Sequence, residues 1–237
     1  MQLTVRNVSE LLSVSEKTVY RWITERRLPG YRVSGQYRFN RAELLEWATG
    51  NKVQVSASIL HENESELGPM PDLGEALQAG GIHYRLTGED KGEVLRNVVE
   101  MLRLPEGVDR GFLWEVLMAR EALESTGVGD GIAIPHARSP IVLHVTRPMV
   151  TLCFLEKPVE FGALDGKPVH ALFSLISPTV KGHLHLLSRL AFALRDATLK
   201  AAIERQAGRD DIVAEFRRVE QRWQHGQGEA RMAGKEG

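Results

Sequence analysis

The chain has 237 residues, a length sufficient for about two domains. Hydrophobic residues make up 43% of it and charged residues 26%, a composition typical of globular domains with a buried core. No apolar run approaches the roughly 20 residues of a membrane-spanning helix, and the N-terminus has no basic stretch followed by an apolar one. We therefore expect a cytoplasmic protein with no signal peptide and no membrane contact. The single cysteine, Cys153, excludes an intramolecular disulfide and a zinc site built from cysteines, and it lies in an apolar pattern that predicts burial.

The net charge of −1 is unevenly distributed along the chain. Residues 1–50 hold eight lysines and arginines against five acidic residues, a net charge of +3, so the remainder carries −4. This split indicates a small basic module in front of a larger acidic one, with different partners for each.

The first 50 residues predict a small helical module with one hairpin. A Leu-Pro-Gly segment at 28–30 breaks the chain, and short strands on both sides of the Ser-Gly pair at 34–35 predict the hairpin. Each expected helix follows a residue whose side chain can cap it: Thr4 before residues 5–12, Ser15 before 16–25, and Asn40, with Glu43 in a capping box, before a helix that ends near residue 48.

The rest of the chain predicts one larger domain with flexible segments on both sides. Residues 51–78 are mostly polar or small and indicate a linker with one short helical piece near 73–77, and the polar, glycine-rich residues 224–237 predict a disordered tail. Strands and helices alternate over 79–223, which predicts an α/β domain. Its strands are expected at 82–86, 149–154 and 169–176, and its helices at 89–102, 110–122, 181–194, 198–207 and 210–223.

Two helices joined by a three-residue turn form the core of a helix-turn-helix unit, whose second helix enters the major groove of DNA. The hairpin would act as a wing that reaches the DNA backbone or the adjacent minor groove. The predicted DNA-contacting residues are Ser15, Lys17, Thr18, Tyr20 and Arg21 on the second helix, and Arg32, Gln36 and Arg38 on the hairpin.

Residues 1–49 closely resemble the excisionase-like, winged helix-turn-helix modules related to the mercury-resistance regulator group. The resemblance implies a DNA-binding winged helix. Short modules of this type can also serve in protein interaction or dimerisation, and a net charge of +3 is modest for a DNA-binding domain, so that alternative stays open. The matching stretches are LTV at 3–5, LLSVS at 11–15, TVYRW at 18–22, LPG at 28–30 and YRF at 37–39.

A second informative segment, residues 120–136, reads REALESTGVGDGIAIPH. Its glycine-rich loop can expose backbone N–H groups to an anion, and it leads through a short apolar strand to a proline-fixed turn that presents His136. A neutral imidazole has a lone pair for in-line attack on phosphorus, and the phosphoryl oxygens then need cations or hydrogen-bond donors nearby. Arg120 precedes the loop, and His183 lies at the start of a helix, where N–H groups also favour an anion. The residues predicted to line the phosphate loop are Ser125, Thr126, Gly127, Gly129 and Gly131.

Residues 81–218 resemble the enzyme IIA domain of the fructose/mannitol and nitrogen-regulatory branch of the bacterial phosphotransferase system, most specifically at 125–136 and in HLHLL at 183–187. The resemblance implies a mixed sheet flanked by helices, with His136 phosphorylated on a ring nitrogen by a histidine phosphocarrier protein that is charged from phosphoenolpyruvate. It also implies that Arg120 and His183 line the site. The chain would then be a phosphocarrier, with no cofactor, rather than an enzyme that turns over a small substrate.

The remaining candidates favour structural roles. His185 would point about 200° away from His183 on a helix, which indicates a packed or surface histidine. A metal site of His136, His183 and His185 is disfavoured because no matching carboxylate accompanies the HxH spacing. Structural or surface roles are also expected for His144, His170, His61, His83, for Asp130 as a turn residue, and for Arg138 as a solvated charge.

The fusion of the two modules favours a regulator, in which the phosphorylation state of His136 controls DNA binding or a protein target of the IIA domain. A homo-oligomer is expected, because one module offers few DNA contacts. Two alternatives stay open at this point. One is a IIA component that passes phosphate to a separate IIB sugar-transport subunit, and the other is a protein-interaction module that is not phosphorylated.

Overall fold

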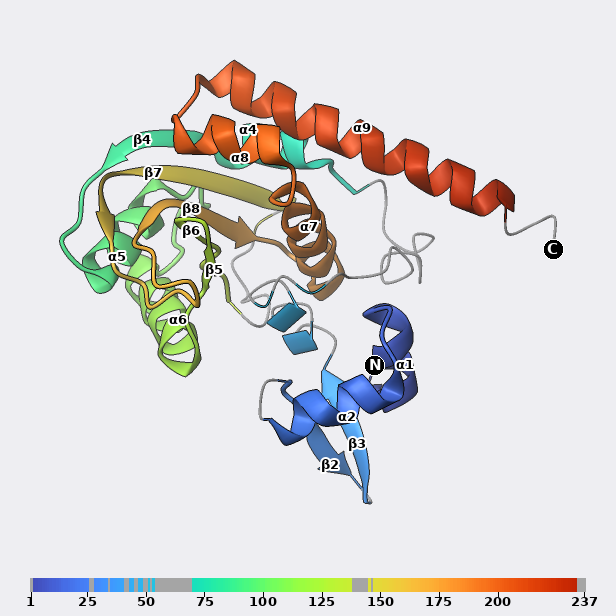
Figure 1. Cartoon of the computed structure of the whole chain (residues 1–237). Coiled ribbons are helices and arrows are strands. Elements are labelled where there is room, and N and C mark those ends of the chain that lie inside the picture. The colour runs from blue at the N-terminus through green and yellow to red at the C-terminus, as the bar shows by residue number, and fades with distance from the viewer. Residues whose placement is uncertain are drawn as a thin grey trace. The chain divides into compact units, whose positions relative to one another are not determined.

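The computed structural model describes residues 2–25, 28–33, 35–40, 43–44, 47–48, 51, 53, 70–137, 145 and 147–233 (Figure 1). The chain divides into two compact units, Met1–Pro69 and Met70–Gly237. Among the described residues, no helix is both long enough and apolar enough to cross a bilayer.

The first unit contains the predicted helix-turn-helix followed by a hairpin. Helix α1 (Val5–Leu11) is capped by Thr4 and α2 (Glu16–Thr24) by Ser15, as the sequence predicts. Residues 43–44 and 47–48 are helical, whereas the expected cap at Asn40 lies outside the described side chains. Strands β1 (Gln2–Leu3), β2 (Tyr31–Val33) and β3 (Gln36–Asn40) form an antiparallel sheet in the order β1-β3-β2.

A small apolar core fixes the turn between α1 and α2. Ser13 in that turn has a φ of 53°, and the Trp22 and Trp47 rings lie 5.0 Å apart between centroids. Helix α2 buries Val19 in this core and leaves Lys17, Tyr20 and Arg21 exposed. The buried residues of this core are Val8, Leu12, Val19, Leu28, Phe39, Leu44 and Trp47.

The second unit is built on a five-stranded mixed sheet in the order β4-β7-β8-β6-β5. The strand pairs β4–β7 and β6–β8 are parallel, whereas β7–β8 and β5–β6 are antiparallel. Residues 149–155 of β7 and nearly all of β8 are buried, as expected for a sheet covered on both faces. The strands are β4 (Ile82–Leu86), β5 (Gly127–Gly129), β6 (Ile132–Ala133), β7 (Met149–Val159) and β8 (Val169–Ile176).

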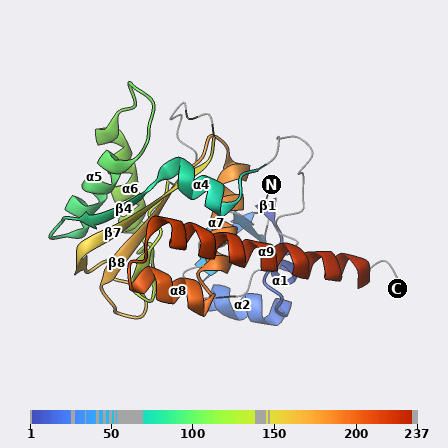
Figure 2. The ribbon, with the colours of Figure 1, turned by 90° about the horizontal axis from the view of Figure 1, so that it is seen from above.

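Helices cover the two faces of this sheet, giving three layers (Figures 1 and 2). On one face, α5 and α6 pack against apolar side chains of β7 and β8, including Cys153, whose burial raises the pKa of its thiol to about 12. On the other face, Phe173 of β8 meets Phe216 of α9 at a centroid distance of 5.9 Å. The helices are α4 (Leu73–Gly80), α5 (Lys91–Met101), α6 (Arg110–Leu123), α7 (Val180–Ala193), α8 (Ala197–Glu204) and α9 (Arg209–Ala233).

Helix α4 belongs to the second unit, so the expected linker over 51–78 overlaps the folded domain at residues 70–78. A Cβ on Gly80 would lie 2.1 Å from the Val150 carbonyl oxygen, which shows how closely α4 approaches β7. The buried carboxylate of Glu220 in α9 accepts a hydrogen bond from the Leu73 N–H at 2.8 Å. It also forms an ion pair with Arg189 of α7, at 2.8 Å. This one carboxylate therefore ties α4, α7 and α9 together.

Helix α9 continues to residue 233, through most of the stretch from residue 224 for which the sequence predicts a disordered tail. The packed part of α9 supplies the nucleus, and each further residue then adds a hydrogen bond at little cost. Glutamine, glutamate, alanine and arginine in this stretch are good helix formers.

Candidate active site

His136 extends the line of β6 beside the end of β8. It forms an isolated parallel bridge with Leu175, in the same register that pairs Ile132 with Ala171. Two residues before His136, the Ile134 N–H donates to the Thr126 carbonyl at 2.9 Å. This bond joins the segment after β6 to the residue that precedes β5. These backbone bonds hold a side chain that is only 3% exposed.

The tautomer of His136 follows from its local partner. Its Nδ1 lies 2.6 Å from the Ile134 carbonyl oxygen, and a carbonyl oxygen only accepts hydrogen bonds. Nδ1 therefore carries the proton, which leaves the lone pair on Nε2. In a neutral imidazole of this tautomer, Nε2 is the ring nitrogen that can attack an electrophile.

His183 lies beside His136, brought there by the first turn of α7. Thr179 caps this helix, accepting from the Gly182 N–H through its hydroxyl and from the His183 N–H through its carbonyl, both at 3.0 Å. The two imidazole centroids are 5.1 Å apart with an interplanar angle of 39°, and both Nε2 atoms are buried. The positive end of the α7 dipole is therefore close to His136, where it favours negative charge.

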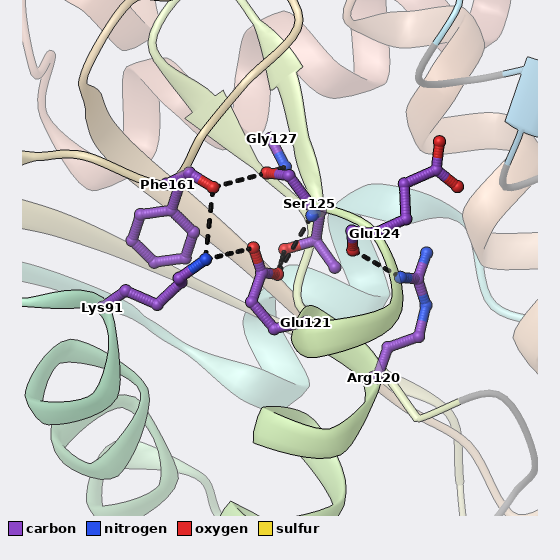
Figure 3. Close-up of polar contacts among 8 residues, drawn as sticks. Lys91, Arg120, Glu121, Glu124, Ser125, Gly127 and Phe161 are labelled. Atoms are coloured by element: carbon purple, nitrogen blue, oxygen red, sulfur yellow. Dashed lines mark hydrogen bonds and ion pairs between the residues drawn. The ribbon is translucent and has the colours of Figure 1, made fainter.

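Arg120 lies in the last turn of α6 and is 7% exposed. Its Nη1 donates to the Glu124 carbonyl at 2.8 Å, which holds the guanidinium at the junction between α6 and the segment that leads to β5 (Figure 3). Its expected contact with a phosphoryl group stays a prediction.

The glycine-rich segment is a β-hairpin, β5–β6, rather than the open loop expected from the sequence. The Thr126 N–H donates to Glu121 Oε2 at 3.0 Å and the Gly127 N–H to Ser125 Oγ at 3.0 Å, so both are bonded within the protein. Gly131 accepts from two backbone N–H groups of β8 through its carbonyl. The glycines serve close packing, since a Cβ on Gly131, where φ is +70°, would lie 2.3 Å from the His170 ring.

Three comparisons with known proteins decide the family. Residues 75–219 match the family described as phosphoenolpyruvate-dependent sugar phosphotransferase system, EIIA 2. The chain belongs to this family. Residues 3–52 match a helix-turn-helix domain family, so the resemblances read from the sequence are confirmed for both units.

Relatives of the EIIA 2 domain include regulatory and sugar-specific proteins. A nitrogen regulatory protein of Pseudomonas aeruginosa is 38% identical over 132 residues, which is 54% of this chain and 83% of that protein. A fructose-specific EIIA component of Haloferax volcanii is 35% identical over 114 residues, covering 45% of this chain and 71% of that protein. The solved structure of nitrogen regulatory protein IIA-Ntr from Neisseria meningitidis aligns with a TM-score of 0.52 at 28% identity, covering 60% of this chain and 97% of that one.

The other described histidines of the EIIA 2 domain take no part in the His136–His183 ring contact. His185 Nε2 lies 3.3 Å from the Pro71 carbonyl oxygen, before α4. Burial lowers the pKa of His170, which lies in β8 beside Gly131 of the hairpin. Burial together with Arg103 and Arg209 lowers the pKa of His83. His61, Arg138 and His144 lie outside the described residues. Within the part of the chain that the structure describes, no group of three or more potential ligands could hold a metal ion.

Asp130 occupies the turn of the β5–β6 hairpin with a φ of 54°. Its N–H donates to Asp165 at 2.8 Å, and its carboxylate pairs with Lys200 at 3.1 Å and Lys167 at 3.9 Å. The turn is thus anchored by charges on the neighbouring segments.

The helix-turn-helix unit exposes Ser15, Lys17, Tyr20 and Arg21, whereas Thr18 is partly buried. The Ser15 and Thr18 hydroxyls lie 2.9 Å apart, at the N-terminal end of α2. On the wing, Arg38 bonds Gln36 Oε1 at 2.8 Å, while the Tyr37 ring meets Tyr20 edge-on at 6.2 Å. The side chain of Arg32 lies outside the described residues.

Sequence reasoning missed Glu121, a buried carboxylate directly after Arg120. Its side chain is 1% exposed and pairs with Lys91 of α5 at 3.4 Å. Acidic residues in amphipathic helices usually face solvent, so the pattern of α6 gives no sign that Glu121 is buried. The only signal in the sequence is its position between Arg120 and the glycine-rich segment.

Proposed function

We propose that this protein is a phosphorylation-responsive regulator whose EIIA 2 domain accepts a phosphoryl group on Nε2 of His136 and whose helix-turn-helix unit binds duplex DNA. The observation that carries the first part is the 2.6 Å contact between Nδ1 and the Ile134 carbonyl, because it assigns the lone pair to Nε2. The donor would be a histidine phosphocarrier protein charged from phosphoenolpyruvate.

The transfer is an in-line displacement at phosphorus. The Nε2 lone pair of His136 forms the new N–P bond while the N–P bond of the donor's phosphohistidine breaks, and its electron pair returns to the donor ring. The positive charge that develops on the His136 ring is stabilised through Nδ1–H by the Ile134 carbonyl. His183 at the α7 N-terminus and the guanidinium of Arg120 would stabilise the phosphoryl oxygens.

Both Nε2 atoms are buried, so the side chains that cover the rings must move before a donor phosphohistidine can reach His136. Donor docking and opening of the site are therefore coupled steps. A site that opens only for its donor also protects the phosphohistidine from water.

Regulation rather than transport is favoured by the fusion itself and by the relatives. The EIIA 2 domain is similar in sequence to nitrogen regulatory proteins of several bacteria, and a helix-turn-helix family matches the first unit. Exposed Lys17 and Arg21 on α2 are placed as recognition-helix residues that meet phosphates or base edges. One unit offers few contacts, so we propose that the protein binds DNA as a dimer on paired half-sites.

A second candidate is a phosphotransferase component that delivers phosphate to a separate IIB subunit. The similarity to fructose-specific EIIA components favours it. Rapid transfer of phosphate from the labelled chain to a purified IIB subunit, with no effect of phosphate on DNA binding, would select this candidate over the regulator.

The phosphoacceptor is tested by incubating the full chain with labelled phosphoenolpyruvate, enzyme I and the histidine phosphocarrier protein. The proposal expects an acid-labile, base-stable phosphoprotein that is absent in His136→Ala. Undiminished labelling of His136→Ala would place the acceptor elsewhere, and no labelling of the wild-type chain would favour a protein-interaction module.

A further inference from the structure

The buried carboxylate of Glu121 stands at the start of a continuous series of hydrogen bonds that ends on His136. Lys91 of α5 reaches its Oε1 at 3.4 Å (Figure 3). The Thr126 N–H and hydroxyl donate to its Oε2 at 3.0 and 2.5 Å. The Thr126 carbonyl accepts from the Ile134 N–H at 2.9 Å, and the Ile134 carbonyl accepts from His136 Nδ1 at 2.6 Å.

Strand β6 of the hairpin between these ends is held in register by β8, whereas β5 is the edge strand of the sheet and needs another anchor. Strand β6 has two residues and β5 has three, two of which are glycines. Short, glycine-rich strands specify their register weakly, because they bury few side chains and keep much conformational freedom. A one-residue shift of this pair would break the bond from the Ile134 N–H to the Thr126 carbonyl, which orients the peptide groups on either side of Ile134, including the carbonyl that accepts from the His136 ring.

Glu121 supplies that anchor at the end of the hairpin nearest His136. It fixes Thr126 through two donors at once, and Lys91 holds the carboxylate in place by also donating to the Phe161 carbonyl at 3.4 Å. A buried carboxylate is costly unless it is paired and hydrogen-bonded, and in some proteins such a group defines one arrangement rather than adding stability.

We propose that Glu121 is a positioning residue for phosphoryl transfer, which acts through Thr126 and Ile134 to keep the Nδ1–H tautomer and the orientation of the His136 ring. The proposal rests on the proposed function, since it assumes that Nε2 of His136 is the reacting atom. It adds a residue that makes no contact with the phosphoryl group in this scheme.

The test uses Glu121→Gln, which keeps the shape of the side chain but places an NH₂ group against either Lys91 or the Thr126 donors. The matched control is Asp165→Asn, the same amidation at the opposite end of the same hairpin, where the carboxylate accepts the Asp130 N–H at 2.8 Å. Imidazole ¹⁵N spectra of the full chain report the His136 tautomer without any donor present.

In Glu121→Gln the Nε2–H tautomer of His136 gains population. Phosphorylation slows by about 10-fold to 100-fold, the scale known for removing the outer hydrogen-bond partner of a metal-binding histidine. Asp165→Asn retains the wild-type tautomer and rate. If Glu121→Gln does not fold, Thr126→Val, which lacks the hydroxyl donor, gives the same shift, and Thr126→Ser restores it.

A wild-type tautomer ratio in Glu121→Gln or Thr126→Val overturns the proposal, and so does a shifted ratio with an unchanged transfer rate. Failure of the proposed function looks different, because the wild-type chain would then carry no phosphate on His136. The ¹⁵N spectra would still report whether Glu121 orients the ring.

Discussion

The imidazole rings of His136 and His183 lie 5.1 Å apart between centroids, one at the end of a short strand and the other in the first turn of α7. Only the folded sheet brings these two residues together. The pair places the proposed phosphoacceptor, a second ring and the positive end of a helix at one buried position, and a helix N-terminus favours an anion such as a phosphoryl group.

Replacing His183 with alanine should slow phosphorylation of His136 by roughly 10²-fold to 10³-fold, since a donor to the transferring phosphoryl group is lost. His185→Ala is the matched control on the same helix, because its ring faces the Pro71 carbonyl. Single-turnover transfer from the phosphorylated carrier protein measures both rates. Equal rates for His183→Ala and His185→Ala would remove His183 from the mechanism.

Removing Lys17 or Arg21 should weaken DNA binding, because both side chains are exposed on α2. The slope of log affinity against log salt concentration is negative, and each lost phosphate contact reduces its magnitude by about 0.9. Arg85→Ala, which removes one positive charge from the EIIA 2 domain, is the control and should leave the slope unchanged. Selection of bound genomic fragments supplies the DNA, and recovery of nothing above background would count against DNA binding by this unit.

Phosphorylation of His136 should change the affinity of the chain for DNA or for a protein partner. Charge screening at physiological salt acts over about 8 Å, so the effect should come from contacts that the phosphorylated face makes or loses rather than from long-range repulsion. The expected coupling is about 1–3 kcal/mol, or 5-fold to 150-fold. Unmodified, phosphorylated and His136→Ala chains are compared in one titration at fixed salt, with mass measured in parallel. Identical affinity and mass in all three would show that the two units are not coupled.

Asp196 should make stability depend on acid pH. It caps α8 by accepting from the Thr198 and Leu199 N–H groups, and its hydrogen bond with Arg218 of α9, the main cause, holds the pKa of Asp196 below its usual value. A lowered folded-state pKa means that this stabilisation is present above the unfolded-state pKa of about 3.9 and is lost as the pH falls through the folded value.

Asp196→Asn keeps the cap but loses the charge, so it should be less stable by about 1 kcal/mol at pH 7, with the difference shrinking below about pH 4. Urea unfolding followed by circular dichroism at pH 7 and pH 3 measures this. Glu156→Gln, which breaks the exposed pair with Arg85, is the control. A difference that is the same at both pH values would contradict the role of the charge.

Local sequence patterns predicted the regular elements well because their causes are local. The caps Thr4 and Ser15 precede helices that begin as expected, and the strands at Ile82–Leu86 and Val169–Ile176 have the expected bounds. Burial of Cys153 is also confirmed. Each of these features depends on residues within a few positions of one another.

The features that sequence patterns missed depend on contacts far apart in the chain. The β5–β6 hairpin has too few side chains to show an alternating pattern, and it is held by Glu121, Phe161 and Asp165 from other elements. Helix α4 looked like part of a linker because its stability comes from close packing on β7 and from Glu220 of α9. The pairing of His136 with His183 was implied by family resemblance, since spacing alone does not bring them together.

The atom that carries the phosphate tests the account most directly. The chain, labelled with ¹⁵N on its histidines, is phosphorylated by enzyme I and the histidine phosphocarrier protein, and the coupling between ³¹P and ¹⁵N is recorded. The account predicts one phosphohistidine, at His136, with phosphorus bonded to Nε2 and the proton retained on Nδ1. Phosphorus on Nδ1 of His136, or on any other residue, would contradict it.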